Sequence, residues 1–155
     1  MATLTIVHGF LGAGKSTFSK QLAQKTGAVR LNADEYCETH FTAKQLEFDW
    51  NTCFSQSVIL LWHQTEIFIA EGRDVILDFG FWGFQSREDA RQRATAMGAG
   101  FQHYYVHAPQ AVLLRRIALR GGPVAEANLK NFDSLWQGFE EPRPTENAIP
   151  VPTAA

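Results

Sequence analysis

The chain has 155 residues, of which 45% are hydrophobic and 19% are charged, and its formal net charge is −2. This composition is that of a single globular domain with its own core, and it excludes a disordered or fibrous chain. The weak negative charge makes nucleic acid an unlikely partner, and no apolar run or leader pattern suggests a membrane partner, so we expect a cytoplasmic protein.

The first predicted elements are a strand over residues 3–8, a glycine-rich loop over 9–17 and a helix over 15–26. The loop fits Gly-x4-Gly-Lys-Ser/Thr, the phosphate-binding pattern of P-loop proteins, and it stands between a strand and a helix as that pattern requires. Its backbone N–H groups and the positive helix end would hold a triphosphate. Lys15 would reach the β- and γ-phosphates, and Ser16 would bind Mg²⁺. The residues expected to bind the nucleotide here are Gly9, Gly12, Ala13, Gly14, Lys15, Ser16 and Thr17.

Further along, strands alternate with helices. The predicted elements are a strand over 28–31, a helix over 43–71, a strand over 74–79, a helix over 86–97 with Ser86 as N-cap, a strand over 101–106, a helix from Pro109 to Gly121, a helix over 126–138 and a short edge strand over 149–151. This alternation predicts an α/β fold with three layers and a parallel sheet, whose ligands bind at the carboxyl ends of the strands.

Two acidic residues end predicted strands on that functional edge, whereas Asp74 opens its strand at the other edge. Asp78 follows the apolar residues 75–77, where an aspartate would organise Mg²⁺ or its waters. Asp34 follows the neighbouring strand and suits the base that accepts the proton of an acceptor hydroxyl. The alternative for Asp34 is the N-cap of the segment after it, and the two roles are compatible.

Arginines near the end of the predicted 109–121 helix could close over the transferred phosphoryl group. Arg116 and Arg120 share one helix face, and the glycines after them form a natural hinge for a mobile lid. The alternative is a solvated basic face. Arg87 and Arg91 share a face of another helix and could line the acceptor side, although a solvated face explains them equally well.

Aromatic residues gather after both strand-end aspartates. They are Tyr36 and Phe41 after Asp34, and Phe79, Phe81, Trp82 and Phe84 after Asp78. Aromatic stripes usually belong to a core. The glycines among residues 79–84 disfavour a regular element, however, and leave a partly apolar acceptor pocket as the second interpretation.

These motifs together resemble those of the small P-loop kinases of the AAA-type ATP-binding family, which includes chloramphenicol phosphotransferase, zeta toxin and phage polynucleotide 5′-hydroxyl kinases. The resemblance rests on the loop, residues 31–36, residues 75–78 with Arg87 downstream, the Arg116-x3-Arg120 pair, and residues 139–142 followed by Glu146. It implies ATP and Mg²⁺ as cofactors, Asp34 as base, Lys15, Arg116 and Arg120 in catalysis, and adenine held between the lid helix and Pro142.

Two motifs of related families are missing from this sequence. Polynucleotide kinases and chloramphenicol phosphotransferase place an arginine three or four residues after the aspartate, whereas Cys37 and Glu38 stand there in this chain. The loop also resembles that of metallochaperone GTPases, but the Asn-Lys-x-Asp motif that reads guanine is missing. A phosphate-bearing acceptor and GTP are therefore both disfavoured.

The sequence thus predicts an enzyme, a P-loop kinase domain over residues 1–146 with a helical lid around 116–138 and a Pro-rich tail over 147–155. It would transfer the γ-phosphate of ATP to a hydroxyl of a small molecule, with antibiotics and metabolites as candidates. The acceptor-binding residues would be Asp34, Tyr36, Asp78, Phe81, Trp82 and Arg87, and the Mg²⁺ ligands Ser16 and Asp78. The alternatives are a polynucleotide or nucleoside kinase and a nucleotide-binding regulatory or toxin-like module.

Overall fold

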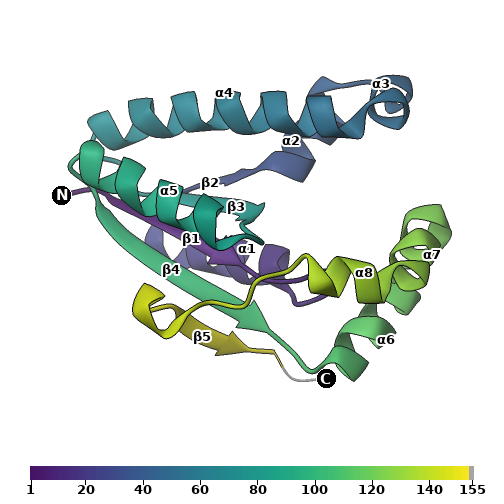
Figure 1. Cartoon of the computed structure of the whole chain (residues 1–155). Helices are drawn as coiled ribbons and strands as arrows, with labels where there is room; N and C mark the ends of the chain where they lie inside the picture. Colours follow the sequence, from purple (N-terminus) through teal and green to yellow (C-terminus); the bar gives the residue numbers. More distant parts are fainter. Residues whose placement is uncertain (154–155) are drawn as a thin grey trace.

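Five parallel strands in the order β2-β3-β1-β4-β5 form the centre of the structure, a computed structural model that describes residues 1–153 (Figure 1). The strands are β1 (Thr3–His8), β2 (Val29–Asn32), β3 (Val75–Gly80), β4 (Gly100–His107) and β5 (Ile149–Pro152). The sheet confirms the predicted α/β fold. It also confirms the short edge strand near residue 149, which pairs with β4.

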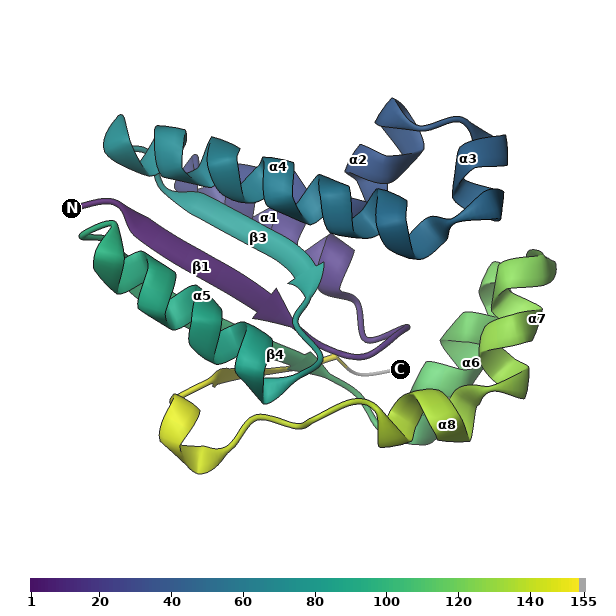
Figure 2. The ribbon, with the colours of Figure 1, turned by 45° about the horizontal axis from the view of Figure 1, so that its top comes forward.

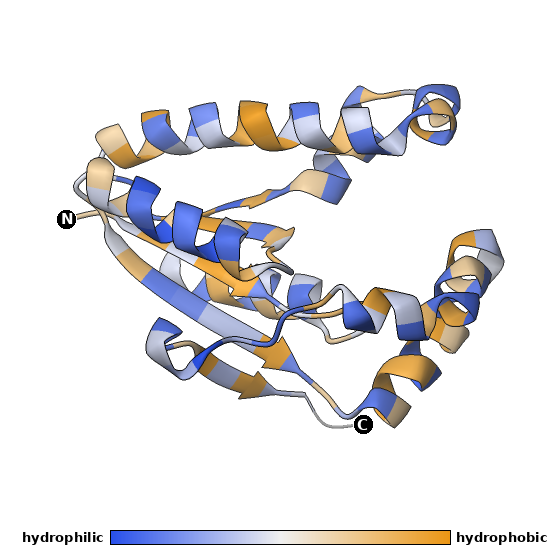
Figure 3. Cartoon of the chain, in the orientation of Figure 1, coloured by the Kyte–Doolittle hydropathy of each residue, from blue (hydrophilic) through white to orange (hydrophobic). Residues whose placement is uncertain are grey.

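Helices cover both faces of this sheet (Figure 2). On β1, Leu4 and Ile6 join the core beneath α4 (Trp50–Ala70) and α5 (Phe84–Ala96). Val7 points the other way and joins the core beneath α1 (Lys15–Thr26) and α6 (Gln110–Arg120). This alternation follows from the two-residue period of a strand that is buried on both faces. Figure 3 shows the hydrophobic residues along the central strands and the polar surface of α5.

Several predicted helix boundaries are wrong. The helix over 43–71 is two helices, α3 (Ala43–Phe48) and α4, because the Asp49 side chain accepts a hydrogen bond from the Thr52 backbone N–H and starts a new helix. The helix over 126–138 is likewise divided into α7 (Gly122–Lys130) and α8 (Phe132–Gln137). Ser86 is not an N-cap, since α5 starts at Phe84 and the Ser86 hydroxyl donates back to the Gly83 carbonyl.

One helix of the site is missing from the predicted elements. α2 (Ala33–His40) follows β2 directly, and its N-cap is Asn32, whose side chain accepts from the Glu35 backbone N–H at 2.9 Å. The N-cap interpretation of Asp34 is therefore wrong, because Asp34 lies inside the first turn. Near the carboxyl end of the chain, a 3-10 turn, η1 (Pro144–Glu146), precedes β5.

The α6, α7 and α8 helices extend beyond the sheet at the end where the glycine-rich loop lies (Figure 2). Gly121 and Gly122 both have positive φ, at 64° and 87°, where the chain passes from α6 to α7. The lid stays a prediction. Of the predicted tail, residues 154–155 lie outside the described part of the chain. Among residues 1–153, no helix is long and apolar enough to cross a membrane.

Candidate active site

The glycine-rich loop opens a set of backbone N–H groups toward one space. Gly14 is the N-cap of α1 with φ 100°, and no side chain caps this helix end. Gly12 has φ 78°, so both positions favour glycine. At Gly9 a Cβ atom would lie 2.5 Å from the Val106 carbonyl oxygen, which leaves no room for a side chain. The free N–H groups and the helix dipole together form an anion site.

Lys15 lies at the start of α1 and its ammonium donates to the Phe10 carbonyl at 3.1 Å, which folds the side chain back over the loop. Burial lowers the pKa of Lys15, while the carboxylates of Asp78 and Asp34 act in the opposite direction. The two carboxylates compensate the buried ammonium only in part. A phosphate group bound beside Lys15 would therefore stabilise its charge further.

Asp78 lies at the carboxyl end of β3 and is buried. Its Oδ2 accepts hydrogen bonds from the Ser19 hydroxyl at 2.9 Å, the Asn32 amide at 3.1 Å and the Arg30 guanidinium at 3.3 Å. The Asn32 contact follows from the sheet, because these two residues are register partners on β2 and β3. Arg30 has no role in the predicted site, yet it compensates the charge of Asp78.

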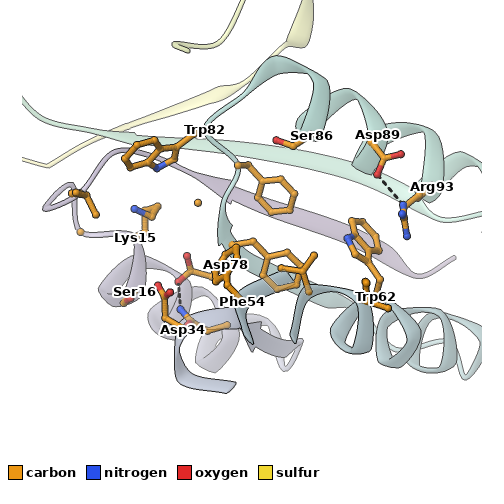
Figure 4. Close-up of a pocket in the computed structure, with 18 of the residues that line it drawn as sticks. Lys15, Ser16, Asp34, Phe54, Trp62, Asp78, Trp82, Ser86, Asp89 and Arg93 are labelled. Carbon is orange, nitrogen blue, oxygen red and sulfur yellow. Dashed lines mark hydrogen bonds and ion pairs between the residues drawn. The ribbon is translucent and has the colours of Figure 1, made fainter. Parts of the chain in front are cut away.

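Asp34 projects from the first turn of α2 toward the same space (Figure 4). Partial removal from water raises the pKa of Asp34, and the nearby charge of Lys15 counteracts this. A carboxylate with a raised pKa next to a cation suits proton acceptance.

These residues border one pocket of about 800 Å³ (Figure 4). It runs from the glycine-rich loop along the end of β3, between α4 and α5. Nine predicted site residues line it: Gly12, Gly14, Lys15, Ser16, Asp34, Asp78, Phe81, Trp82 and Arg120. A volume of this size accommodates the phosphates and a second small molecule.

The half of the pocket away from the loop combines an aromatic cluster with aliphatic, polar and charged residues. Phe81 stacks on Phe79 with 5.5 Å between ring centroids, Trp62 meets Phe79 edge-on, and the Arg93 guanidinium lies 4.5 Å above the Trp62 ring. The α4 and α5 residues of this wall are not among the predicted site residues. They are Phe54, Val58, Ile59, Trp62, His63, Glu66, Ser86, Asp89 and Arg93.

Five other predicted residues, from the loop, α2 and α5, do not line the pocket. Tyr36 stacks on His40 with 3.8 Å between ring centroids, away from the pocket lining. Arg87 is buried beneath the pocket wall and is bound to Glu146, so it does not line the acceptor side. Gly9, Ala13 and Thr17 belong to the loop but not to the pocket lining.

The two predicted lid arginines differ in position. Arg120 lines the pocket. Arg116 donates to the Gly12 carbonyl at 3.1 Å and to the Thr153 hydroxyl at 2.9 Å, while Thr153 itself donates to the Ala13 carbonyl at 2.7 Å. Arg116 thus lies between the loop and the end of β5. The segment around Pro142 packs toward α5, where the Arg143 guanidinium lies over Phe84, and the adenine contact at Pro142 stays a prediction.

The oxygen donors of the site fit Mg²⁺. Ser16 and Asp78 line the same pocket beside the loop. Mg²⁺ commonly takes one or two protein oxygens and completes its shell with phosphates and water. Within residues 1–153 no group of three or more His, Cys, Asp or Glu side chains could hold a metal ion without such additional ligands.

A phosphate-binding loop between β1 and α1, at the end of a parallel sheet in the order 2-3-1-4-5, defines a P-loop nucleotide-binding domain. The AAA domain family matches residues 4–142, and the chain belongs to this family. Its fold is also that of solved small P-loop kinases. A search of curated proteins finds no significant match.

Solved kinase structures share this fold. A gluconokinase from Sinorhizobium meliloti is 17% identical, with 99% of this chain and 83% of that chain covered and a TM-score of 0.70. The Mycobacterium tuberculosis APS kinase CysC, solved with AMPPNP and APS, is 16% identical, with 97% and 88% covered and a TM-score of 0.68. A chain of a Pnkp1/Rnl/Hen1 complex is 21% identical, with 74% and 38% covered and a TM-score of 0.64.

Proposed function

We propose that this protein transfers the γ-phosphate of ATP to a hydroxyl group of a small, partly apolar molecule that binds between α4 and α5. The observation that carries this proposal is the continuity of the pocket, which joins the glycine-rich loop to an aromatic wall with Asp34 beside the junction. A flat apolar body would bury its area against the aromatic surface of this wall.

In the proposed reaction, Asp34 accepts the proton of the acceptor hydroxyl as the acceptor oxygen forms its bond to the γ-phosphorus. The bond between this phosphorus and the β–γ bridging oxygen breaks, and ADP leaves. Lys15 and Arg120 offset the negative charge on the phosphates, and Ser16 and Asp78 would hold Mg²⁺. Mg²⁺ supplies charge neutralisation on the β- and γ-phosphates when bound.

A transfer screen tests the proposal. The protein is incubated with Mg·ATP and pooled aromatic alcohols, sugars, nucleosides and 5′-hydroxyl oligonucleotides, and products are detected by mass spectrometry as a gain of about 80 daltons, one HPO₃ unit. We expect the gain on an aromatic or other partly apolar alcohol, and its loss in the Asp34→Asn variant.

The same screen separates the alternatives. A gain confined to oligonucleotides or nucleosides identifies a polynucleotide or nucleoside kinase. If calorimetry shows that ATP binds but no acceptor class stimulates its turnover, the phosphotransferase proposal is wrong and a nucleotide-binding regulatory module is favoured.

A further inference from the structure

Arg87 is a buried cation that lies outside the pocket, with its side chain 1% exposed. Its guanidinium forms a two-point ion pair with Glu146, with distances of 2.6 Å from Nε to Oε1 and 3.1 Å from the second nitrogen to Oε2. Glu146 is also buried, since its side chain is 8% exposed. Such a pair fixes the direction of both side chains, because the planar guanidinium matches the carboxylate.

The remaining terminal nitrogen of Arg87 donates to the carbonyl oxygens of Phe81 at 2.9 Å and Trp82 at 3.1 Å. Both residues line the pocket, and Trp82 stacks on Phe10 of the glycine-rich loop. Phe81 has φ 50°, in the left-handed region that is unfavourable for a bulky residue. Arg87 therefore holds the backbone of the wall in a shape that the local sequence disfavours.

A second set of contacts ties the same guanidinium to β1. Arg87 has only donors, so the Nε2 atom of His8, 3.2 Å away, must accept. The proton of His8 then lies on Nδ1 and is donated to Nε2 of His103 at 3.3 Å. The remaining nitrogen of His103 lies 4.0 Å from Oε1 of Glu146, which closes a ring of four side chains. His8 directly precedes Gly9, so this ring connects the wall to the strand that carries the loop.

We propose that Arg87 and Glu146 are a positioning pair that sets the acceptor wall, residues 81–82, relative to the phosphate-binding loop. The role of this wall in acceptor binding rests on the proposed function. Neither side chain touches the pocket, so the pair acts through the two carbonyl groups and His8. Loss of the pair is then expected to weaken acceptor binding while leaving Mg·ATP binding nearly unchanged.

The test uses the full chain labelled with 5-fluorotryptophan, in which the ¹⁹F signal of Trp82 is assigned from the Trp82→Phe variant. Arg87→Lys and Glu146→Gln each remove the two-point pair. Arg91→Lys and Glu88→Gln are matched controls, because these two residues form an exposed ion pair on the same helix. We expect the Trp82 signal to move or split in the first two variants only, with the Trp50 and Trp62 signals in place.

Titration with benzyl alcohol, a flat aromatic alcohol, then measures binding to the wall through the same signals. Its dissociation constant should rise by roughly tenfold in both variants, whereas that of Mg·AMPPNP should change by less than about twofold. An unchanged Trp82 signal in both variants overturns the positioning role. The positioning role is also overturned if all four tryptophan signals shift together in the Glu146→Gln variant. If benzyl alcohol does not bind the parent protein, the proposed apolar acceptor is contradicted, and the Trp82 signal still decides the positioning role.

Discussion

The hydroxyl of Ser19 on α1 donates a hydrogen bond of 2.9 Å to the carboxylate of Asp78 at the end of β3. The same hydroxyl accepts from Nε of Arg30 at 2.7 Å. The helix that follows the phosphate-binding loop is thereby connected to two neighbouring strands through one buried polar cluster. The position of Asp78 relative to the loop depends on this cluster.

Ser19→Ala should lower the free energy of unfolding by about 1–3 kcal/mol, because the buried carboxylate of Asp78 loses one donor and Arg30 loses an acceptor. Urea denaturation followed by circular dichroism measures the change. Ser86→Ala, at an exposed serine of α5, is the control and should change it by less than about 0.5 kcal/mol. Equal changes in the free energy of unfolding at the two positions would show that the hydrogen bonds of Ser19 do not stabilise the protein.

Lys15→Met should weaken Mg·ATP binding by about 10- to 100-fold, the loss expected for one hydrogen bond from a cation to a charged group. Since burial lowers the pKa of Lys15, the charged form is disfavoured in the folded protein, and the neutral variant should melt no lower than the parent. Calorimetry and thermal unfolding measure both properties. Lys20→Met, at a lysine whose side chain is 60% exposed, should leave ATP binding unchanged.

Asp34→Asn should decrease phosphoryl transfer by about 10²- to 10⁴-fold, the usual contribution of a general base, while ATP binds as before. The measurement is the initial rate with the best acceptor from the transfer screen. Glu38→Gln removes an acid from the exposed surface of the same helix and should retain the parent rate. Full activity of Asp34→Asn would exclude Asp34 as the base.

The pKa of Asp34 gives a prediction that needs no acceptor. Burial raises this pKa above the ordinary value of 3.8, and the charge of Lys15 opposes the increase. Carboxyl ¹³C NMR should therefore find the Asp34 midpoint above 3.8, and higher still in Lys15→Met. The acid limb of the transfer rate should follow the same midpoint, because the rate falls as Asp34 becomes protonated. A midpoint that does not respond to Lys15→Met would place the two groups too far apart to interact.

The buried histidines predict how stability depends on pH. Burial lowers the pKa of His8 to about 2 and that of His103 to about 4, whereas both groups titrate near 6.5 in the unfolded chain. Between pH 6.5 and 4 the unfolded chain therefore binds protons that the folded protein does not. The contribution of these histidines to the free energy of unfolding should be fully present above pH 6.5. It should decrease on acidification by up to about 1.4 kcal/mol per pH unit for each histidine.

Urea titrations at several pH values measure this slope. His103→Gln should make it shallower, and His63→Gln, at an exposed histidine, should leave it unchanged. The lowered pKa of Glu146 adds a loss of the same sign below pH 4.5. A slope that is equal in the parent and in His103→Gln would contradict the prediction.

The loop, the strands and the order of elements could be predicted because their signals are local. The glycine spacing, the apolar run over 75–77 and the turn glycines each act within a few residues. The α2 helix was not predicted although its start also has a local signal, the N-cap contact between Asn32 and Glu35 three residues later. The break at Asp49 has the same kind of cause, a side-chain cap within a continuous helical pattern.

The candidate site was harder to predict wherever its contacts are long-range. The ion pair between Arg87 and Glu146 spans 59 residues, and no local pattern indicates that α5 and η1 meet. Similarly, Val58 and Trp62 lie within the predicted helix over 43–71, but no local pattern indicates that they border a pocket as well as the core. Arg30 shows no motif at all, and only the sheet register brings it to Asp78.

In the wall at Phe81 and Trp82, the backbone and the side chains make different contacts. Arg87 donates hydrogen bonds to the backbone carbonyls of the wall, while the side chains of the wall line the pocket. Exchanging either aromatic ring would therefore change which molecules are accepted without moving the peptide that carries it. Preference for a new acceptor could evolve, or be engineered, at positions 81 and 82 alone, with the reaction centre left in place.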